Sequence, residues 1–352
     1  MKTCLSGQHG ALARDIAAEI GFRADHDLGA PDGASDVRPE GATPRGSPLS
    51  AALARLLERL SALIALVNPA GVVVQGDTTT ALAGALAAFH LGIPCFHVEA
   101  GLRTSNPLRP FPEEMNRRLL TRLAALHFAP TEHARQNLLA EGVPAGDVHV
   151  TGNTVIDALE QFAGQRAPHA QGGSKDEATS TARPMILVTL HRREGSEIAP
   201  AIARAVAELA SSGGVDVTWI RHPNPTSEAA LAALGEDSRV RVLPPQPYAA
   251  FVALMRRARV ILTDSGGVQE EAPVLGVPVV VLRGETDRPE AVAAGNAVVV
   301  GGDAVAIARA CRELVHDAEI HAFRSRATSP FGDGGASPRI VAALDAYFAA
   351  RR

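Results

Sequence analysis

The sequence predicts an α/β protein made of two Rossmann-like halves, and three features carry this prediction. Short β-branched runs alternate with longer helical patterns, one segment without apolar periodicity divides the chain, and polar residues follow directly after several apolar runs. The alternation is typical of βαβ units around a parallel sheet. The chain of 352 residues also exceeds the ~100–200 residues of a usual domain. Two domains are therefore expected.

The first alternation predicts an N-terminal domain over residues 1–165. Its clearest elements are strands expected at 72–74 and 95–98 and helices expected at 80–91 and about 113–126. Residues 166–183 are rich in Gly, Ser, Thr, Ala and charge, which predicts a linker or exposed loop. The final amphipathic helix, within 339–352, is expected to pack back on this first domain.

The second alternation predicts a C-terminal domain over residues 184–338. Strands are expected at 185–189, 217–220, 240–243, 260–263 and 279–282, and helices near 198–211, 226–234 and 248–257.

The composition excludes several classes of partner. With 34 basic and 38 acidic residues, the net charge of −4 offers no general basic surface for nucleic acid or anionic lipid. Cys4, Cys95 and Cys311 are too few and too scattered for a disulfide framework or a zinc site, and an odd count suits a reducing compartment. The apolar stretch 81–89 is far shorter than the ~20 residues of a membrane-spanning helix. A cytoplasmic protein without a membrane segment is expected.

Two carboxylates follow successive strands of the first half. Asp77 comes directly after the run at 72–74, and Glu99 follows the strand at 95–98. Ligands of parallel α/β sheets bind beyond the carboxyl ends of the strands, so these acids are candidate acid/base groups. The alternative for Asp77 is an N-cap of the next helix. Glu113, at the start of a helix, is explained on local grounds by the helix dipole.

The second half places a histidine and two arginines after its first strand. His191 follows residues 185–189 and is itself followed by Arg192 and Arg193. A hydrogen-bonded core histidine is one interpretation, and an anion site is the other. The adjacent arginines favour the anion site.

The turn after residues 260–263 is the most informative local signal. Ser265, Gly266 and Gly267 precede a helix, where glycines let a phosphate approach free backbone amides. The alternative is a tight turn that needs positive φ. Glu271 either binds a ribose or is solvated, and Arg288 either contacts an anion or is a solvated loop charge.

Taken together, these segments resemble the non-hydrolysing UDP-N-acetylglucosamine 2-epimerase family over nearly the whole chain. The segments that carry the resemblance are 75–80 (QGDTTT), 97–103 (HVEAGLR), 112–117 (PEEMNR), 151–157 (TGNTVID), 191–194 (HRRE), 222–225 (HPNP), 264–271 (DSGGVQEE) and 288–290 (RPE). The resemblance implies two Rossmann-like domains in the GT-B arrangement. It also implies inversion of carbon 2 of UDP-N-acetylglucosamine to give UDP-N-acetylmannosamine, for surface polysaccharides, by elimination and re-addition of UDP. The implied enzyme is a homodimer that needs no metal and no other cofactor.

The resemblance also implies a role for individual residues. Asp77, Glu99 and Glu113 would be the acid/base carboxylates, and His191 would act near the diphosphate. Ser265, Gly266 and Gly267 would hold phosphate, Glu271 the ribose, and Gln246 and Phe251 the uracil. The remaining substrate-binding residues would be Arg117, Arg192, His222 and Arg288.

Three departures from the family pattern lead to further expectations. The chain begins at what resembles the second strand of the family, followed by Gln8 and His9, so a central strand and a phosphate-side arginine are expected to be absent. We expect such a chain to be less stable and less active than one with that strand. After Glu194, Gly195 and Ser196 make a shorter loop than family members usually have. Gly10 occupies a position, after Gln8 and His9, at which family members commonly have an arginine.

Two other functions remain open. A GT-B glycosyltransferase would share the nucleotide site but would not need three carboxylates facing the sugar. A non-catalytic protein that binds sugar nucleotides would bind UDP-sugars without turning them over.

Overall fold

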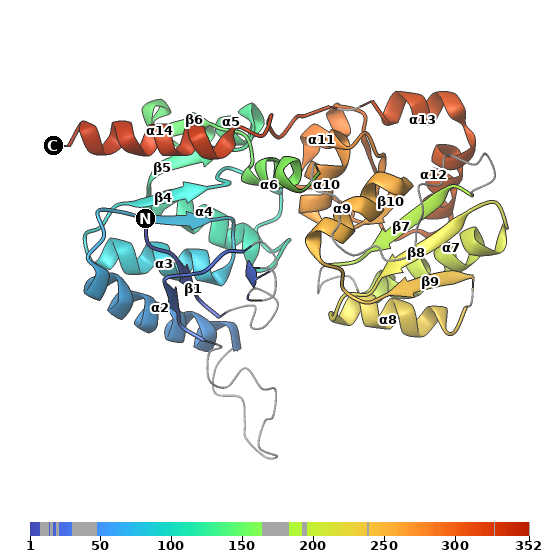
Figure 1. Ribbon diagram of the computed structural model, residues 1–352, viewed down its shortest axis with the longest axis horizontal. Coiled ribbons are helices and arrows are strands. Elements are labelled where there is room, and N and C mark those ends of the chain that lie inside the picture. The colour runs from blue at the N-terminus through green and yellow to red at the C-terminus, as the bar shows by residue number, and fades with distance from the viewer. Residues whose placement is uncertain are drawn as a thin grey trace, which may run out of the picture. The chain divides into compact units, whose positions relative to one another are not determined.

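The computed structural model divides into two compact units, and each is described by itself (Figure 1). The first unit contains residues 1–151 and 343–352, and the second contains residues 152–342. The structure describes residues 1–7, 14, 17–18, 21–29, 48–163, 183–191, 196–237, 239–326 and 328–351. Most of the expected linker lies outside the described residues. The same is true of five residues named above: Gln8, His9, Gly10, Arg192 and Gly195.

A parallel sheet forms the centre of the first unit. Its strands run in the order β3–β4–β5–β6, with bounds Val72–Gln75, Cys95–Val98, Ala124–Ala129 and Val148–Val150. Strand β4 is buried along its whole length, whereas β3 is an edge strand of this sheet and Val73 is 48% exposed. A separate parallel pair is formed by β1 (Cys4–Leu5) and β2 (His26–Asp27).

An alanine-rich helix lies between the sheet and an outer helix. Helix α3 (Thr79–His90) places Ala81, Ala85 and Ala88 against the sheet and Ala83 and Ala87 against α2 (Pro48–Val67). Small side chains on both sides allow this close packing. The other helices of the unit are α4 (Glu113–Leu123), α5 (Glu132–Ala140) and the short η1 (Ala145–Asp147).

The expected helix over 113–126 is too long. It ends at Leu123, and the next residues form β5, which pairs with β4 and β6. No glycine or proline occurs in the segment 123–126, so the local sequence does not mark the end of the helix. The pairing with two neighbouring strands decides it.

The C-terminal helix α14 (Ala336–Ala349) supplies aromatic cover to the first unit. Tyr347 and Phe348 meet Phe96 of β4 edge to face, with ring centroids 4.9 and 5.7 Å apart. Gly71 is required beside this cluster, because a Cβ there would lie 2.4 Å from the Phe96 ring. Residues 343–352 group with the first unit, whereas α6 (Thr154–Ala163), expected in the first domain, groups with the second.

The second unit is built on a six-stranded parallel sheet in the order β12–β11–β10–β7–β8–β9. The strands are β7 (Met185–Thr189), β8 (Asp216–Ile220), β9 (Val240–Leu243), β10 (Ala258–Thr263), β11 (Val279–Val281) and β12 (Ala297–Val299). The helices are η2 (Ser196–Ile198), α7 (Ala199–Ser211), α8 (Pro225–Leu234), α9 (Tyr248–Arg257), α10 (Gly266–Val274), α11 (Pro289–Ala293), α12 (Ala304–His316) and α13 (Ala318–Arg324).

Helices cover both faces of this sheet, which explains why its central strands read as continuous apolar runs. Ile186 and Val188 of β7 belong to one core with α7 and α12. Leu187, between them, belongs to a second core with α6, α9 and α10. Among the described helices of the chain, none has the length and apolarity to cross a membrane.

Candidate active site

The first unit brings two of the expected carboxylates together. Asp77 and Glu99 follow β3 and β4, whose last residues, Gln75 and Val98, are paired in register. A Cβ added at Gly76 would lie only 3.7 Å from Oε2 of Glu99. The Glu99 carboxylate therefore lies beside Gly76, the residue that precedes Asp77. Two acids of this unit therefore lie close together at adjacent strand ends.

The backbone at both strand ends is left-handed. Gly76 has φ +69° and Glu99 has φ +64°. Among the described residues other than glycine, only Asn68 and Glu99 have positive φ. This conformation costs roughly 1–2 kcal/mol for a residue with a side chain, and such strain is typical of functional sites.

A buried histidine supports the turn before Asp77. Nε2 of His97 lies 2.8 Å from the carbonyl oxygen of Gly76. Burial lowers the pKa of His97 to about 4, so the ring is neutral at pH 7 and donates its Nε2–H to that carbonyl. His127 is the register partner of His97 on β5, and burial lowers its pKa to about 4 as well. Both rings therefore act as neutral structural groups.

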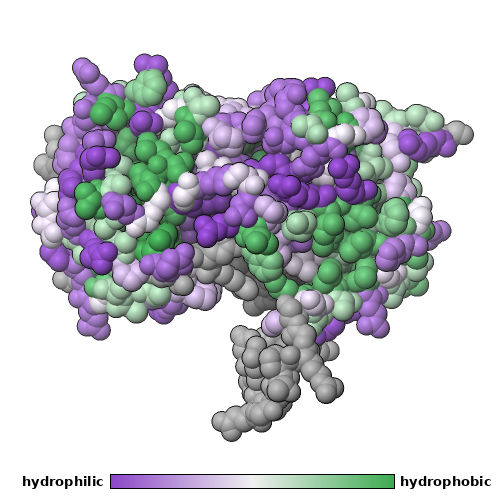
Figure 2. Space-filling model, turned by 180° about the vertical axis from the view of Figure 1, so that it is seen from behind, coloured by the Kyte–Doolittle hydropathy of each residue, from purple (hydrophilic) through white to green (hydrophobic). Residues whose placement is uncertain are grey.

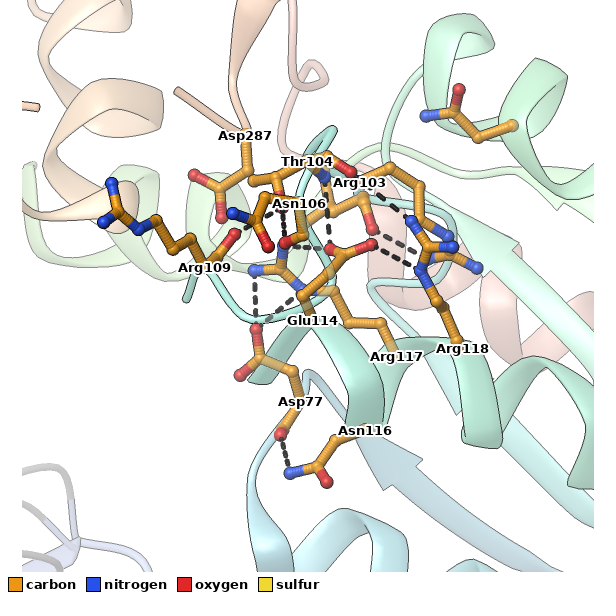
Figure 3. Close-up of polar contacts among 12 residues, drawn as sticks. Asp77, Arg103, Thr104, Asn106, Arg109, Glu114, Asn116, Arg117, Arg118 and Asp287 are labelled. Carbon is orange, nitrogen blue, oxygen red and sulfur yellow. Dashed lines mark hydrogen bonds and ion pairs between the residues drawn. The ribbon is translucent and has the colours of Figure 1, made fainter. Parts of the chain in front are cut away.

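Two residues of helix α4 contact Asp77, one at its main-chain carbonyl and the other at its side-chain carboxylate (Figure 3). The side-chain amide of Asn116 donates to the Asp77 carbonyl at 2.8 Å. Arg117, expected to bind substrate, contacts Oδ2 of Asp77 through Nη2 at 2.6 Å and Nε at 2.8 Å. Asp77 is not the N-cap of α3, because Thr78 fills that position and accepts from the Ala81 amide.

Glu114 is a site residue that sequence reasoning missed. Glu113 and Glu114 both lie in the first turn of α4, and Glu114 is fully buried. Its carboxylate accepts from the backbone amide of Thr104, from Arg117 and from Arg118. The signal was present in the sequence, since arginines at i+3 and i+4 on a helix face the same glutamate.

In the second unit, His191 and an aspartate lie at neighbouring strand ends. Thr189 of β7 and Thr263 of β10 are register partners, and Oδ1 of Asp264 accepts from the His191 amide at 2.7 Å. Nε2 of His191 lies 2.6 Å from the Thr189 hydroxyl, and its ring centroid is 4.9 Å from that of His222. Desolvation, and to a smaller degree His222, lower the pKa of His191, although part of the residue is open to solvent.

The Ser265–Gly267 turn opens α10. Ser265 is the N-cap residue but makes no side-chain cap hydrogen bond. Gly266 and Gly267 are absent from the positive-φ glycines, so a strained turn does not explain them. Close approach explains Gly266, because a Cβ there would lie 3.2 Å from Nη2 of Arg288. The backbone amides at this helix start are thus accompanied by a guanidinium.

Arg288 is a buried residue rather than a solvated loop charge. Its Nε lies 2.5 Å from Glu270 and its Nη1 lies 2.9 Å from Asp287. Asn153, from the segment 151–157, donates to the other oxygen of Glu270 at 2.5 Å. These contacts fix the guanidinium beside the Ser265–Gly267 turn.

Glu271 is buried one helical turn further along α10. A Cβ at Gly267 would lie 3.9 Å from its Oε2. The Tyr248 hydroxyl donates to Oε1, and burial raises the pKa of Glu271 to about 7. Gln246 and Phe251 are both half-buried, and the Gln246 side-chain amide donates to the Pro244 carbonyl. With its pKa raised by burial, Glu271 titrates near neutrality.

Comparison with known proteins assigns the chain to a family. A family model described as UDP-N-acetylglucosamine 2-epimerase matches residues 1–345. The chain belongs to this family of isomerases. The UDP-N-acetylglucosamine 2-epimerase of Salmonella typhimurium is 41% identical over 353 aligned residues, covering 98% of this chain and 91% of the relative. The Bacillus subtilis epimerase is 43% identical, covering 84% and 77%.

Solved epimerase structures match nearly the whole chain. The Neisseria meningitidis UDP-GlcNAc 2-epimerase bound to UDP-GlcNAc has TM-score 0.84 and 38% identity, covering 96% of this chain and 89% of that one. The S. aureus MnaA–UDP structure has TM-score 0.84 and 36% identity, covering 97% and 87%. The expected α/β fold with two Rossmann-like units is confirmed by these likenesses and by the two parallel sheets.

Proposed function

We propose that this protein interconverts UDP-N-acetylglucosamine and UDP-N-acetylmannosamine by inverting carbon 2 of the sugar. The observation that carries the proposal is the pair of carboxylates, Asp77 and Glu99, held at adjacent strand ends in a member of the epimerase family. Inversion needs a proton to leave carbon 2 on one face and to return on the other. More than one positioned acid/base group is therefore required.

The reaction proceeds by elimination and re-addition. A carboxylate accepts the proton of carbon 2, the electron pair of that bond forms the C1–C2 double bond, and the bond from C1 to the UDP oxygen breaks. UDP then adds back to C1 while a proton reaches carbon 2 on the opposite face. Asp77, Glu99 and Glu113 are assigned as the acid/base groups. Oδ2 of Asp77 is engaged by Arg117, whereas Oδ1 has no hydrogen-bond partner among the described residues and is available to the sugar.

We assign UDP binding to the second unit. The amides of the Ser265–Gly267 turn and the N-terminus of α10 suit the diphosphate, with His191, Arg192, His222 and Arg288 as further polar partners. Glu271 is assigned to the ribose hydroxyls, and Gln246 and Phe251 to the uracil. Stabilising the charge that develops on departing UDP lowers the barrier to elimination.

Incorporation of solvent deuterium tests the reaction. UDP-N-acetylglucosamine incubated with the protein in deuterium oxide is expected to gain deuterium at carbon 2, because the carboxylates that carry the proton exchange with solvent. NMR of the sugar ring measures this, with a sample lacking protein as control. Epimer formed without deuterium would contradict the elimination route. A glycosyltransferase would consume the donor only with an acceptor, and a binding protein would leave it unchanged.

We also propose that the protein is a cytoplasmic homodimer. All three cysteines are free, which suits a reducing compartment. The first unit exposes apolar side chains on two adjacent helices, Phe89 at the end of α3 and Met115 and Leu119 on α4. Figure 2 shows hydrophobic surface gathered on this unit. A second copy of the chain would cover such a surface.

Sedimentation of the purified protein tests the dimer. Wild type is expected to sediment as a dimer, and Leu119→Asp is expected to shift it toward monomer because a buried charge opposes association. Val341→Asp changes an exposed apolar residue of the second unit and serves as the control. A wild-type monomer at micromolar concentration would contradict the proposal.

A further inference from the structure

Asn224 is a buried residue that joins the ends of two neighbouring strands in the second unit. It occupies the N-cap position of α8, after β8, and is 4% exposed. Its Nδ2 donates to the carbonyl of Leu190, the residue before His191, at 2.8 Å, and lies 2.8 Å from Nδ1 of His222. Strands β7 and β8 are paired in register. One side chain therefore contacts both places at which a histidine follows a strand.

The orientation of the Asn224 amide is decided by two backbone partners. Oδ1 accepts from the backbone amide of Ser227 at 2.8 Å, and a backbone N–H can only donate. Nδ2 faces the Leu190 carbonyl, which can only accept. Exchanging the oxygen and the nitrogen would break both contacts. The group that faces Nδ1 of His222 is consequently an NH2 group, which is a donor.

A donor beside Nδ1 decides where the proton of the His222 ring lies. A neutral imidazole carries its proton on one nitrogen and accepts at the other, whereas an imidazolium donates from both. A proton on Nδ1 would leave two donors facing each other, the ring N–H and the NH2 group of Asn224. The contact at 2.8 Å therefore requires Nδ1 without a proton, and the ring proton lies on Nε2.

The first turn of α8 also holds the backbone of His222. Its amide donates to the Ser227 hydroxyl at 3.3 Å, and its carbonyl accepts from the Asn224 amide at 2.8 Å. The ring centroid of His222 is 4.9 Å from that of His191. Two charged rings at this distance would repel each other, so a neutral His222 also suits its neighbour.

We infer that Asn224 is a positioning residue, which holds His222 as a neutral donor, with its proton on Nε2, for the diphosphate of UDP. The inference rests on the proposed function in assigning His222 to that diphosphate. Phosphate oxygens accept hydrogen bonds, and Nδ1 of His222 is occupied by Asn224, so Nε2–H makes the contact. A donor of fixed direction stabilises the charge on departing UDP without giving up its proton.

NMR of protein with isotope-labelled histidine tests the tautomer. At neutral pH we expect His222 to show a pyridine-like nitrogen shift at Nδ1 and a pyrrole-like shift at Nε2. Loss of these signals in His222→Ala assigns them. UDP is expected to move the Nε2 signal and to leave Nδ1 unprotonated. A proton on Nδ1, in the free protein or with UDP bound, would overturn the inference.

Two substitutions separate the capping of α8 from the contact with His222. Serine and aspartate both suit an N-cap, so either variant keeps an acceptor for the Ser227 amide. Asn224→Asp places a carboxylate oxygen beside Nδ1, and we expect the ring to become an imidazolium at neutral pH. Asn224→Ser is too short to reach the ring, and UDP is expected to bind about threefold to tenfold more weakly, the scale of one hydrogen bond. A ring that stays neutral in Asn224→Asp would overturn the inference.

Asp317→Ser is the matched control. Asp317 caps α13 in the same unit by accepting from the backbone amides of Glu319 and Ile320. Its substitution is expected to change neither the UDP affinity, measured by calorimetry, nor the His222 signals.

A double-mutant cycle with His222→Ala separates positioning from a general effect on the fold. If Asn224 acts through His222, Asn224→Ser is expected to cost no further UDP affinity in the His222→Ala background. Wild-type UDP affinity in Asn224→Ser alone, or losses that multiply in the double variant, would overturn the positioning role. A wild-type protein that does not bind UDP would contradict the proposed function instead, and NMR of the free protein would still decide the tautomer of His222.

Discussion

Asp77→Asn and Glu99→Gln are each expected to lower turnover at least about a hundredfold, the scale of lost general acid/base catalysis. Each change replaces a carboxylate by an amide of the same shape, so the strand-end geometry is retained while proton transfer is lost. UDP is expected to bind both variants nearly as well as wild type, because we assign its contacts to the second unit. Steady-state kinetics and calorimetry with UDP measure the two effects.

Glu132→Gln is the control for these variants. Glu132 is an exposed residue of α5 that pairs with Arg135 and contacts neither Asp77 nor Glu99. Its substitution is expected to leave kcat unchanged. Loss of UDP affinity with turnover near the wild-type value in the Asp77 or Glu99 variants would assign those carboxylates to the nucleotide site or to structure.

Binding of UDP-N-acetylglucosamine is expected to weaken about tenfold between pH 8 and pH 6, because Glu271 titrates in this range. Burial raises the pKa of Glu271 to about 7, so its carboxylate is mostly ionised at pH 8 and mostly protonated at pH 6. We assign this carboxylate to the ribose, whose hydroxyls would donate hydrogen bonds to the ionised form. The diphosphate of a sugar nucleotide carries no group that titrates here, and calorimetry across this range measures the affinity.

Two variants isolate this effect. Glu271→Gln is expected to remove the pH dependence, leaving the lower affinity at every pH. Tyr248→Phe removes a donor that favours the charged carboxylate, so the pKa of Glu271 is expected to rise and the weakening to begin at higher pH. An equal pH dependence in Glu271→Gln and wild type would show that another group is responsible.

The sequence predicted the features that depend on local pattern. The strands at 95–98 and 185–189 and the helix at 248–257 are found at the expected residues, because apolar runs and turn residues mark their ends. Asp77 and Glu99 were placed together because parallel strands end at one edge of a sheet. Their closeness in the structure follows from that rule.

The sequence could not predict the features that depend on distant partners. Arg117 is 40 residues from Asp77 in the chain, and no local pattern predicts that its guanidinium contacts this carboxylate. The role of Tyr248 likewise depends on α9 lying beside α10, which brings its hydroxyl to Glu271. The start of β5 was missed because pairing with two strands, and not propensity, ends α4.

The left-handed backbone of Glu99 sets stability against activity at one position. A glycine there would adopt φ +64° without the cost that a side chain incurs, but it would remove the carboxylate. Screening variants for thermal stability alone would therefore enrich glycine at residue 99 and lose catalysts, as expected where a site stores strain. Directed evolution of a more robust enzyme should keep Glu99 fixed and seek its gains on the exposed faces of α2 and α14.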